Sequence, residues 1–210
     1  MASSFVWSDS LLLEDQLTEE ERQIRDSVRD FAETELLPRI LEWNRHEKFD
    51  PDIMKKFGAL GILGATIPDY GCAGIGRVAY GLVCRELERI DTAFRSAVGV
   101  QTGLAMSAIY EFGSDEQKER FLPGMRDGAI IGCFGLTEPD HGSDAGAMTA
   151  RAVGTDGGYL LKGTKIWITH SPIAHVLVVW AKDDEGTIGG FILERGMDGL
   201  ETPKIEGKFG

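Results

Sequence analysis

Residues 132–144 form the part of this chain that is best suited to bind a ligand. The apolar run 132–136 leads directly into the stretch 137–144, which is composed of Thr, Glu, Pro, Asp, His, Gly and Ser. A turn of this composition presents backbone N–H groups and short hydroxyls to an anionic or amide-rich group. Two interpretations are open. The turn is either an ordinary hairpin connection, or a binding loop in which Thr137 and the nearby backbone hold a heterocycle while Ser143 holds a phosphate.

A second segment has the same character and adds an aromatic ring: Lys165-Ile166-Trp167-Ile168-Thr169. The pattern predicts a strand over 159–168, and Thr169 would then point to the same side of the pleat as Trp167. A Trp in a strand usually belongs to a core. The alternative is a ring that stacks beside a donating hydroxyl, which suits the edge of an isoalloxazine. Taken together, the two segments fit the two walls of a flavin site.

A third segment, 86–96, carries both acidic and basic residues. Its simplest interpretation is a solvated helix end with ion pairs between residues three or four positions apart. Arg95 and Ser96 also allow a second interpretation. They directly precede residues 97–112, whose small and apolar side chains predict a helix. A guanidinium at that N-terminal turn, supported by the helix dipole, would suit a carboxylate ligand.

Composition and charge argue against several classes of function. The net charge of −12 is spread along the chain without a Lys/Arg cluster, which argues against nucleic acid as a partner. No apolar stretch approaches the roughly 20 residues of a membrane-spanning helix. Three widely spaced cysteines predict a reducing compartment, either a bacterial cytoplasm or the mitochondrial matrix. The four histidines are scattered, and His170 and His175 lack a third ligand, so we expect no metal site.

The elements that must position these segments change type near residue 128. Before it, the pattern predicts helices, one starting at a capping box of Thr18 and Glu21 and another at Ser114. After it, short apolar runs separated by Gly/Asp turns predict strands over 130–136, 148–153, 159–168, 176–181 and 189–194. We therefore expect an α+β chain of two domains, an all-α domain over 1–128 and an all-β domain over 129–210. The β part looks incomplete, which suggests a fragment of a longer protein.

Two motifs of the chain closely resemble those of the acyl-CoA dehydrogenase family. The family signature is matched by Gly135-Leu136-Thr137-Glu138-x-x-x-Gly142-Ser143-Asp144. The second flavin motif of the family is matched by Lys165-x-Trp167-Ile168-Thr169. The order of helices before strands agrees over essentially the whole chain. One segment resembles the glutaryl-CoA dehydrogenase branch of the family: Glu88-Arg89-Ile90-Asp91-x-x-Phe94-Arg95-Ser96. His170 departs from the pattern, since many relatives have Asn there.

The resemblance implies a helical N-terminal domain, an antiparallel β-barrel middle domain and a C-terminal helical bundle that is absent from this chain. It implies a homotetramer that binds FAD, oxidises an acyl-CoA thioester and passes electrons to electron-transfer flavoprotein. In the glutaryl branch the enoyl product loses CO2 to give crotonyl-CoA. The family's catalytic Glu would lie beyond residue 210, so no catalytic residue is assigned in this chain.

Position by position, the resemblance implies two sets of binding residues. FAD would contact Phe134, Gly135, Leu136, Thr137, Glu138, Gly142, Ser143, Trp167, Ile168 and Thr169. The acyl-CoA would contact Arg95, Ser96, Glu88 and Ser143, with Arg95 and Ser96 on the distal carboxylate and Ser143 near the CoA moiety. Alternative functions are the oxidation of a short- or branched-chain acyl-CoA, or a flavin-binding module without catalysis.

Overall fold

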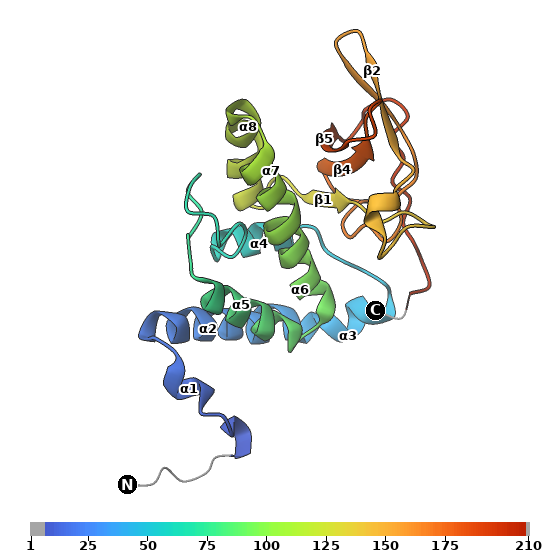
Figure 1. Ribbon diagram of the computed structural model, residues 1–210. Coiled ribbons are helices and arrows are strands. Elements are labelled where there is room, and N and C mark those ends of the chain that lie inside the picture. Colours follow the sequence, from blue (N-terminus) through green and yellow to red (C-terminus); the bar gives the residue numbers. More distant parts are fainter. Residues whose placement is uncertain (1–6, 209–210) are drawn as a thin grey trace.

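The computed structural model describes residues 7–208, in which a set of helices is followed by a single sheet (Figure 1). The helical elements are η1 (Trp7–Asp9), α1 (Leu13–Gln16), α2 (Glu19–Phe31), η2 (Ala32–Leu36), α3 (Leu37–Arg45), α4 (Ile53–Ala59), α5 (Arg77–Glu88), α6 (Thr92–Gly99), η3 (Val100–Met106), α7 (Ser107–Phe112) and α8 (Asp115–Arg126). The strands are β1 (Gly132–Gly135), β2 (Arg151–Thr155), β3 (Gly158–Lys162), β4 (Val176–Lys182) and β5 (Ile188–Glu194), with the short helix η4 (Ala145–Ala147) after β1. The predicted order of helices before strands is confirmed.

Both predicted capping boxes are present. The Thr18 hydroxyl accepts a hydrogen bond from the Glu21 backbone N–H, and the Glu21 carboxylate accepts one from the Thr18 N–H. Ser114 and Gln117 make the same reciprocal pair at the start of α8. These contacts satisfy N–H groups that have no partner within the helix, which explains why α2 and α8 begin where they do.

Two long helices of the N-terminal part are interrupted by π-helical turns. α2 passes through η2 into α3, and α6 passes through η3 into α7. α2 and α3 lie in one line, with α5 beside α2 (Figure 1). Between these helices lies the larger core, whose fully buried members include Leu36, Phe57, Val83, Leu87 and Phe94.

The helix predicted over 97–112 begins earlier than expected. Asp91 is its N-cap, with a side-chain oxygen that accepts a hydrogen bond from the Ala93 N–H at 2.8 Å. The sequence predicted that Asp91 belongs to the charged end of the preceding helix, and this prediction was wrong. Arg95 and Ser96 therefore lie inside α6, one turn after its start, and do not precede the helix.

The sheet corrects the prediction of an antiparallel β-barrel. β4 pairs in parallel with β1 and in antiparallel with β5, while β2 and β3 form an antiparallel hairpin. A single pair, Arg151 with Lys182, joins this hairpin to β4. Among the described residues no pairing connects β3 back to β5, so the sheet is open and mixed. Closure depends on long-range strand pairing, which the local strand pattern does not encode.

A buried carboxylate connects α2 with α5. The Glu86 side chain is fully buried and accepts hydrogen bonds from Arg29 at 3.0 Å, Arg85 at 2.9 Å and Arg89 at 2.8 Å. Burial alone would raise the pKa of Glu86, but the three guanidinium groups outweigh it and lower the pKa to about 2. The carboxylate is therefore charged at neutral pH and holds the two helices together.

We expect Glu86→Gln to lower the free energy of unfolding by about 2 kcal/mol at pH 7, because three guanidinium groups lose a charged acceptor. Urea unfolding of both proteins measures this difference. The difference should shrink as the pH falls from 4.5 towards 2. A carboxylate whose pKa is lowered by folding loses its stabilising effect as it becomes protonated.

The matched control is Glu33→Gln, because Glu33 is half-exposed and makes one bond of 3.3 Å to Arg89. Its effect should stay below about 0.5 kcal/mol, as for exposed ion pairs generally. Equal losses in the two variants would show that the burial of Glu86 contributes nothing.

Candidate functional site

The two ligand-binding segments predicted from the sequence lie side by side in the structure. The Ile166 N–H donates to the Thr137 carbonyl at 2.9 Å, and the Lys165 ammonium donates to the Leu136 carbonyl at 3.0 Å. Residues 132–135 form β1, the strand that leads into the first segment. The second segment follows β3 and therefore reaches β1 through tertiary contacts alone.

Glu138 fixes the shape of the first segment. The residue is 3% exposed, and its carboxylate accepts hydrogen bonds from the Thr149 N–H, the Thr149 hydroxyl, the Ala150 N–H and the Lys165 ammonium, at 2.6 to 2.9 Å. Burial would raise the pKa of Glu138, but these four donors outweigh it and lower the pKa to about 2. All of these partners are internal, so the side chain holds the loop together and does not face a ligand.

The second segment is not the strand that the sequence predicted. β3 ends at Lys162, and Trp167 has a φ of 60°, which places its backbone in the left-handed region. The Trp167 ring is 62% exposed, so it does not belong to the core. The expectation that Trp167 and Thr169 point to the same side of a strand's pleat was therefore wrong. The side chain is accessible from solvent beside a polar loop.

The remaining residues of the two motifs divide into a buried base and an exposed face. Gly135 is buried, and Phe134, Leu136, Thr137 and Ile168 are half-buried. The exposed positions are Gly142, Ser143 and Thr169. The buried group anchors both segments to the sheet, since Phe134 stacks at a tilt against Trp180 with ring centroids 5.7 Å apart. The hydroxyls of Ser143 and Thr169 are left accessible to a ligand.

His170, which stands where many relatives have Asn, is buried at the end of the second segment. Its φ is 70°, a value that Asn and His tolerate better than most residues. Nδ1 lies 3.3 Å from the Gly132 carbonyl, and the ring packs against Phe49. Burial lowers the pKa of His170 to about 4, so the imidazole is neutral at physiological pH. We infer that His170 shapes the backbone here.

Arg95 and Glu88 form an ion pair between α6 and the end of α5. Arg95 Nε donates to Glu88 Oε2 at 2.9 Å, and the Thr92 hydroxyl donates to Glu88 Oε1 at 2.7 Å. The bonds from Thr92 and Arg95 lower the pKa of Glu88. Both charged side chains are nearly half-exposed. The two terminal amino groups of Arg95 make no hydrogen bond within residues 7–208, so they are available to an anionic ligand.

Two glycines, Gly99 and Gly103, follow Arg95 at four-residue spacing along α6 and η3. A Cβ atom added at either glycine would meet nothing within 4 Å. The helix surface at these two glycines is therefore open to solvent.

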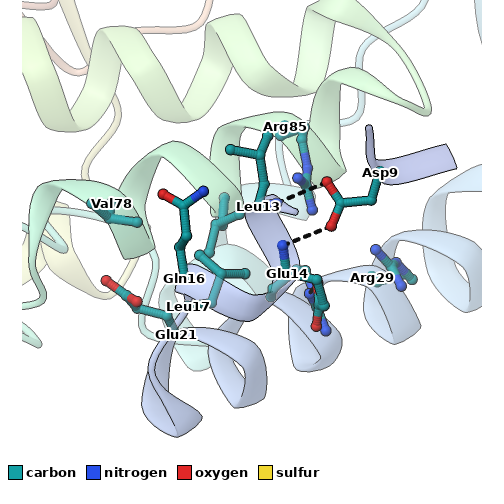
Figure 2. Close-up of a pocket in the computed structure, with 11 residues that line it drawn as sticks. Asp9, Leu13, Glu14, Gln16, Leu17, Glu21, Arg29, Val78 and Arg85 are labelled. Carbon is teal, nitrogen blue, oxygen red and sulfur yellow. Dashed lines mark hydrogen bonds and ion pairs between the residues drawn. The ribbon is translucent and has the colours of Figure 1, made fainter. Parts of the chain in front are cut away.

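A cavity that the motif residues do not line lies elsewhere. Its volume is about 780 Å³, and it lies between the N-terminal arm, α2 and α5 (Figure 2). Figure 2 shows Asp9 facing the first turn of α1, where its carboxylate accepts hydrogen bonds from the Leu13 and Glu14 N–H groups. Arg29, one of its cationic lining residues, is already bonded to Glu86. None of the motif residues lines this cavity, so it is separate from the candidate site.

Other kinds of site receive no support from the part of the chain that the structure describes. Within it, no group of three or more His, Cys, Asp and Glu side chains is arranged to hold a metal ion. No helix in residues 7–208 has both the length and the apolar character that crossing a membrane requires.

The chain belongs to the acyl-CoA dehydrogenase family. Residues 18–129 match the family model of the acyl-CoA dehydrogenase N-terminal domain, and residues 133–210 match that of the middle domain. The fold and the two motifs agree with this assignment.

Relatives within the family differ in the substrate that their names state. Isovaleryl-CoA dehydrogenase from Pongo abelii is 36% identical over 203 residues, which cover 92% of this chain and 48% of that protein. A crystal structure of glutaryl-CoA dehydrogenase from Mycobacterium smegmatis superposes with a TM-score of 0.93 at 46% identity, covering 96% of this chain and 52% of that one. A second structure of glutaryl-CoA dehydrogenase from that organism, in complex with FADH2, gives 0.87 at 44% identity, with coverages of 89% and 48%. The chain thus spans about half the length of these relatives.

Three polar residues near the candidate site were not identified from the sequence. Gln101 is fully buried in η3, and Tyr80 and Cys84 on α5 have Arg95 as an electrostatic neighbour. An amide within a helix of small and apolar residues was the one available signal for Gln101. Tyr80 and Cys84 lie four residues apart, in line with Glu88.

We expect Glu138→Ala to release the loop between the two motifs, because four donors lose their acceptor at once. The Thr149 and Ala150 amides, which donate to Glu138, should exchange with deuterium roughly tenfold faster or more. Hydrogen exchange followed by mass spectrometry measures the change. Asp140→Ala serves as the control, since Asp140 is exposed in the same loop, and it should leave these rates unchanged. Unchanged protection in Glu138→Ala would contradict the proposed anchoring role.

Proposed function

We propose that this chain is the N-terminal half of a FAD-dependent acyl-CoA dehydrogenase whose substrate is glutaryl-CoA. One observation carries the proposal. A half-exposed arginine, Arg95, with free terminal amino groups lies on the helix that packs directly against the strand leading into the flavin motif. The similarity to glutaryl-CoA dehydrogenase, at 46% identity, supports the same substrate.

The residues present fit a bound flavin. The accessible groups of the two motifs are a large aromatic ring, two short hydroxyls and the backbone of a glycine-containing loop, on Trp167, Ser143, Thr169 and residues 137–143. An aromatic ring suits the isoalloxazine plane, and hydroxyls and N–H groups suit its polar edge and the phosphates. FAD would supply the acceptor for the hydride that leaves the acyl chain. Phe134, Gly135, Leu136, Glu138 and Ile168 would support this surface from below.

The substrate assignment depends on the charge of the distal group. Glutaryl-CoA carries a carboxylate at the far end of its acyl chain, and a guanidinium recognises a carboxylate with charge-assisted hydrogen bonds. Arg95 would donate these bonds from its terminal amino groups, while Glu88 holds the guanidinium through Nε. Ser96, the next residue of α6, would add a hydroxyl, and Ser143 would contact the CoA moiety.

Other parts of the reaction lie outside this chain. We propose that a carboxylate beyond residue 210 removes the α-proton, that the enoyl product loses CO2 to give crotonyl-CoA, and that electrons leave through electron-transfer flavoprotein. We also propose a homotetramer, and location in a bacterial cytoplasm or the mitochondrial matrix. These proposals rest on family resemblance.

The second candidate is the oxidation of a branched or short acyl-CoA, which the 36% identity to isovaleryl-CoA dehydrogenase favours. A panel of acyl-CoA thioesters separates the two. Glutaryl-CoA should bleach the flavin absorbance of the complete enzyme faster than isovaleryl-CoA or butyryl-CoA. The opposite order would favour the second candidate. A natural product of only 23.0 kDa by intact mass would indicate a flavin-binding module without catalysis.

We expect Arg95→Ala to lower kcat/KM for glutaryl-CoA by about 10- to 100-fold, the equivalent of one lost charge-assisted hydrogen bond of about 1.5–3 kcal/mol. Butyryl-CoA, which has no distal carboxylate, should lose less than about threefold. Steady-state kinetics on both substrates measure the difference.

Arg120→Ala is the matched control, because Arg120 is an exposed arginine in an ion pair with Glu194 on the sheet. It should leave both substrates unaffected. Equal losses on glutaryl-CoA and butyryl-CoA in Arg95→Ala would count against the carboxylate-binding role.

A further inference from the structure

Gln101 is a fully buried amide that joins a helix to the sheet. Its Nε2 donates to the Met125 carbonyl at 2.9 Å and to the Ile130 carbonyl at 2.8 Å. Its Oε1 accepts from the Gly132 N–H at 2.7 Å. One side chain in η3 therefore contacts the end of α8, the connection to the sheet and the first residue of β1. The Met125 carbonyl also accepts a hydrogen bond from the Gly128 N–H at 3.2 Å.

Gln101 lies in the π-helical turn of η3. Gln101 and Thr102 are consecutive and both fully buried, yet they bond to different parts of the molecule. The Thr102 hydroxyl accepts from the Gly64 N–H at 2.9 Å, in the segment that follows α4. A widened turn of this kind often occurs at functional positions in helices.

The strand and the helix are in direct contact at the same place. A Cβ atom added at Gly132 would lie 2.5 Å from the Met125 methyl group and 2.8 Å from the Ala105 Cβ. A glycine is therefore required for β1 to approach η3 this closely. The hydrogen bonds of the Gln101 side chain and the close contact at Gly132 together fix the position of β1 relative to η3.

The contact of Gln101 in η3 with Gly132 in β1 forms a junction between helix and strand. In the proposed function, this junction connects Arg95, which binds the distal carboxylate, with the flavin motif. Arg95 lies six positions before Gln101 on the same continuous helix, which is about 9 Å along the helix axis. β1 runs from Gly132 directly into the flavin motif. Because the distal carboxylate is held at Arg95 and the reacting carbons must lie against the flavin, the junction sets the distance between them.

We propose that Gln101 is a positioning residue that fixes this distance and so determines the acyl chain length that the enzyme oxidises. The inference rests on the proposed function, since it requires a distal carboxylate held at Arg95. Gln101 does not touch the substrate. It acts through the helix and the strand, whose relative position decides whether the α and β carbons of the acyl chain reach the flavin.

The test uses the complete FAD-loaded enzyme with Gln101→Met, which keeps the length of the side chain and removes its three hydrogen bonds. The substrates are dicarboxylyl-CoA thioesters of four, five and six carbons, with butyryl-CoA as a substrate that has no distal carboxylate. We expect kcat for glutaryl-CoA to fall about tenfold or more relative to kcat for butyryl-CoA, because small misplacements of a bound chain have effects of this size. The activity of the six-carbon relative to the five-carbon substrate should rise.

Gly132→Ala tests the same junction independently and decides the question if Gln101→Met does not fold. The added methyl group pushes β1 away from η3, and we expect the same change in the substrate ratios. Adding Ala105→Gly removes the atom 2.8 Å from that methyl group and should restore the wild-type ratios, at least in part. A rescue of this kind would not arise from a general loss of stability.

Thr102→Val is the matched control for Gln101→Met. Thr102 is the neighbouring buried residue of η3, and the substitution removes its hydrogen bonds with the Gly64 N–H and the Ile62 carbonyl, neither of which belongs to the sheet. It should lower the Tm without changing the substrate ratios. Equal losses on all substrates in Gln101→Met and Gly132→Ala, or unchanged ratios in both, would overturn the inference. A wild-type enzyme that does not prefer glutaryl-CoA would instead overturn the proposed function on which it rests.

Discussion

The buried ion pair of Glu138 and Lys165 is the interaction on which the candidate site depends. These residues are 27 positions apart, and the pair brings the first motif against the second at 2.9 Å. Both side chains are almost fully buried, at 2% and 10% exposure. Removing one partner of such a pair leaves an uncompensated charge, at a cost of about 3–5 kcal/mol. The exposed surface of Trp167, Ser143 and Thr169 exists because this buried pair fixes the segments beneath it.

The charges of Arg95 and Glu88 are arranged in the opposite way. Both side chains are nearly half-exposed, and an exposed pair contributes at most about 1 kcal/mol. Breaking or rearranging this pair therefore costs the fold little, while a carboxylate ligand gains a guanidinium that is already oriented. The chain thus uses buried ion pairs, at Glu138 and Glu86, for structure. The charges at Arg95 are left open to solvent, where a ligand can reach them.

Local features were predictable from the sequence, and features that depend on distant contacts were not. The capping boxes at Thr18 and Ser114 involve residues three positions apart, so their pattern is visible in the chain. The open sheet depends on the pairing of β4 with β1 and β5. The sequence had predicted an antiparallel barrel in its place. Trp167 fitted a strand by residue type, but the positive φ that exposes its ring depends on the contacts of the whole segment. The motif residues were identified, yet the internal role of Glu138 follows only from its four partners.

The helix from Thr92 to Phe112 shows most clearly where sequence periodicity ends. Its existence followed from small and apolar residues, but a regular period of 3.6 cannot indicate which turn is widened. The buried positions of this helix recur as the adjacent pairs Ala97–Val98, Gln101–Thr102 and Ala105–Met106, as on any helix with one buried face. That period does not indicate that Gln101 and Thr102 each bond to the backbone of a different segment. A buried polar side chain in such a helix therefore indicates a hydrogen bond to a neighbouring segment of the fold. Here the attachment joins the helix that carries Arg95 to the strand that carries the flavin motif.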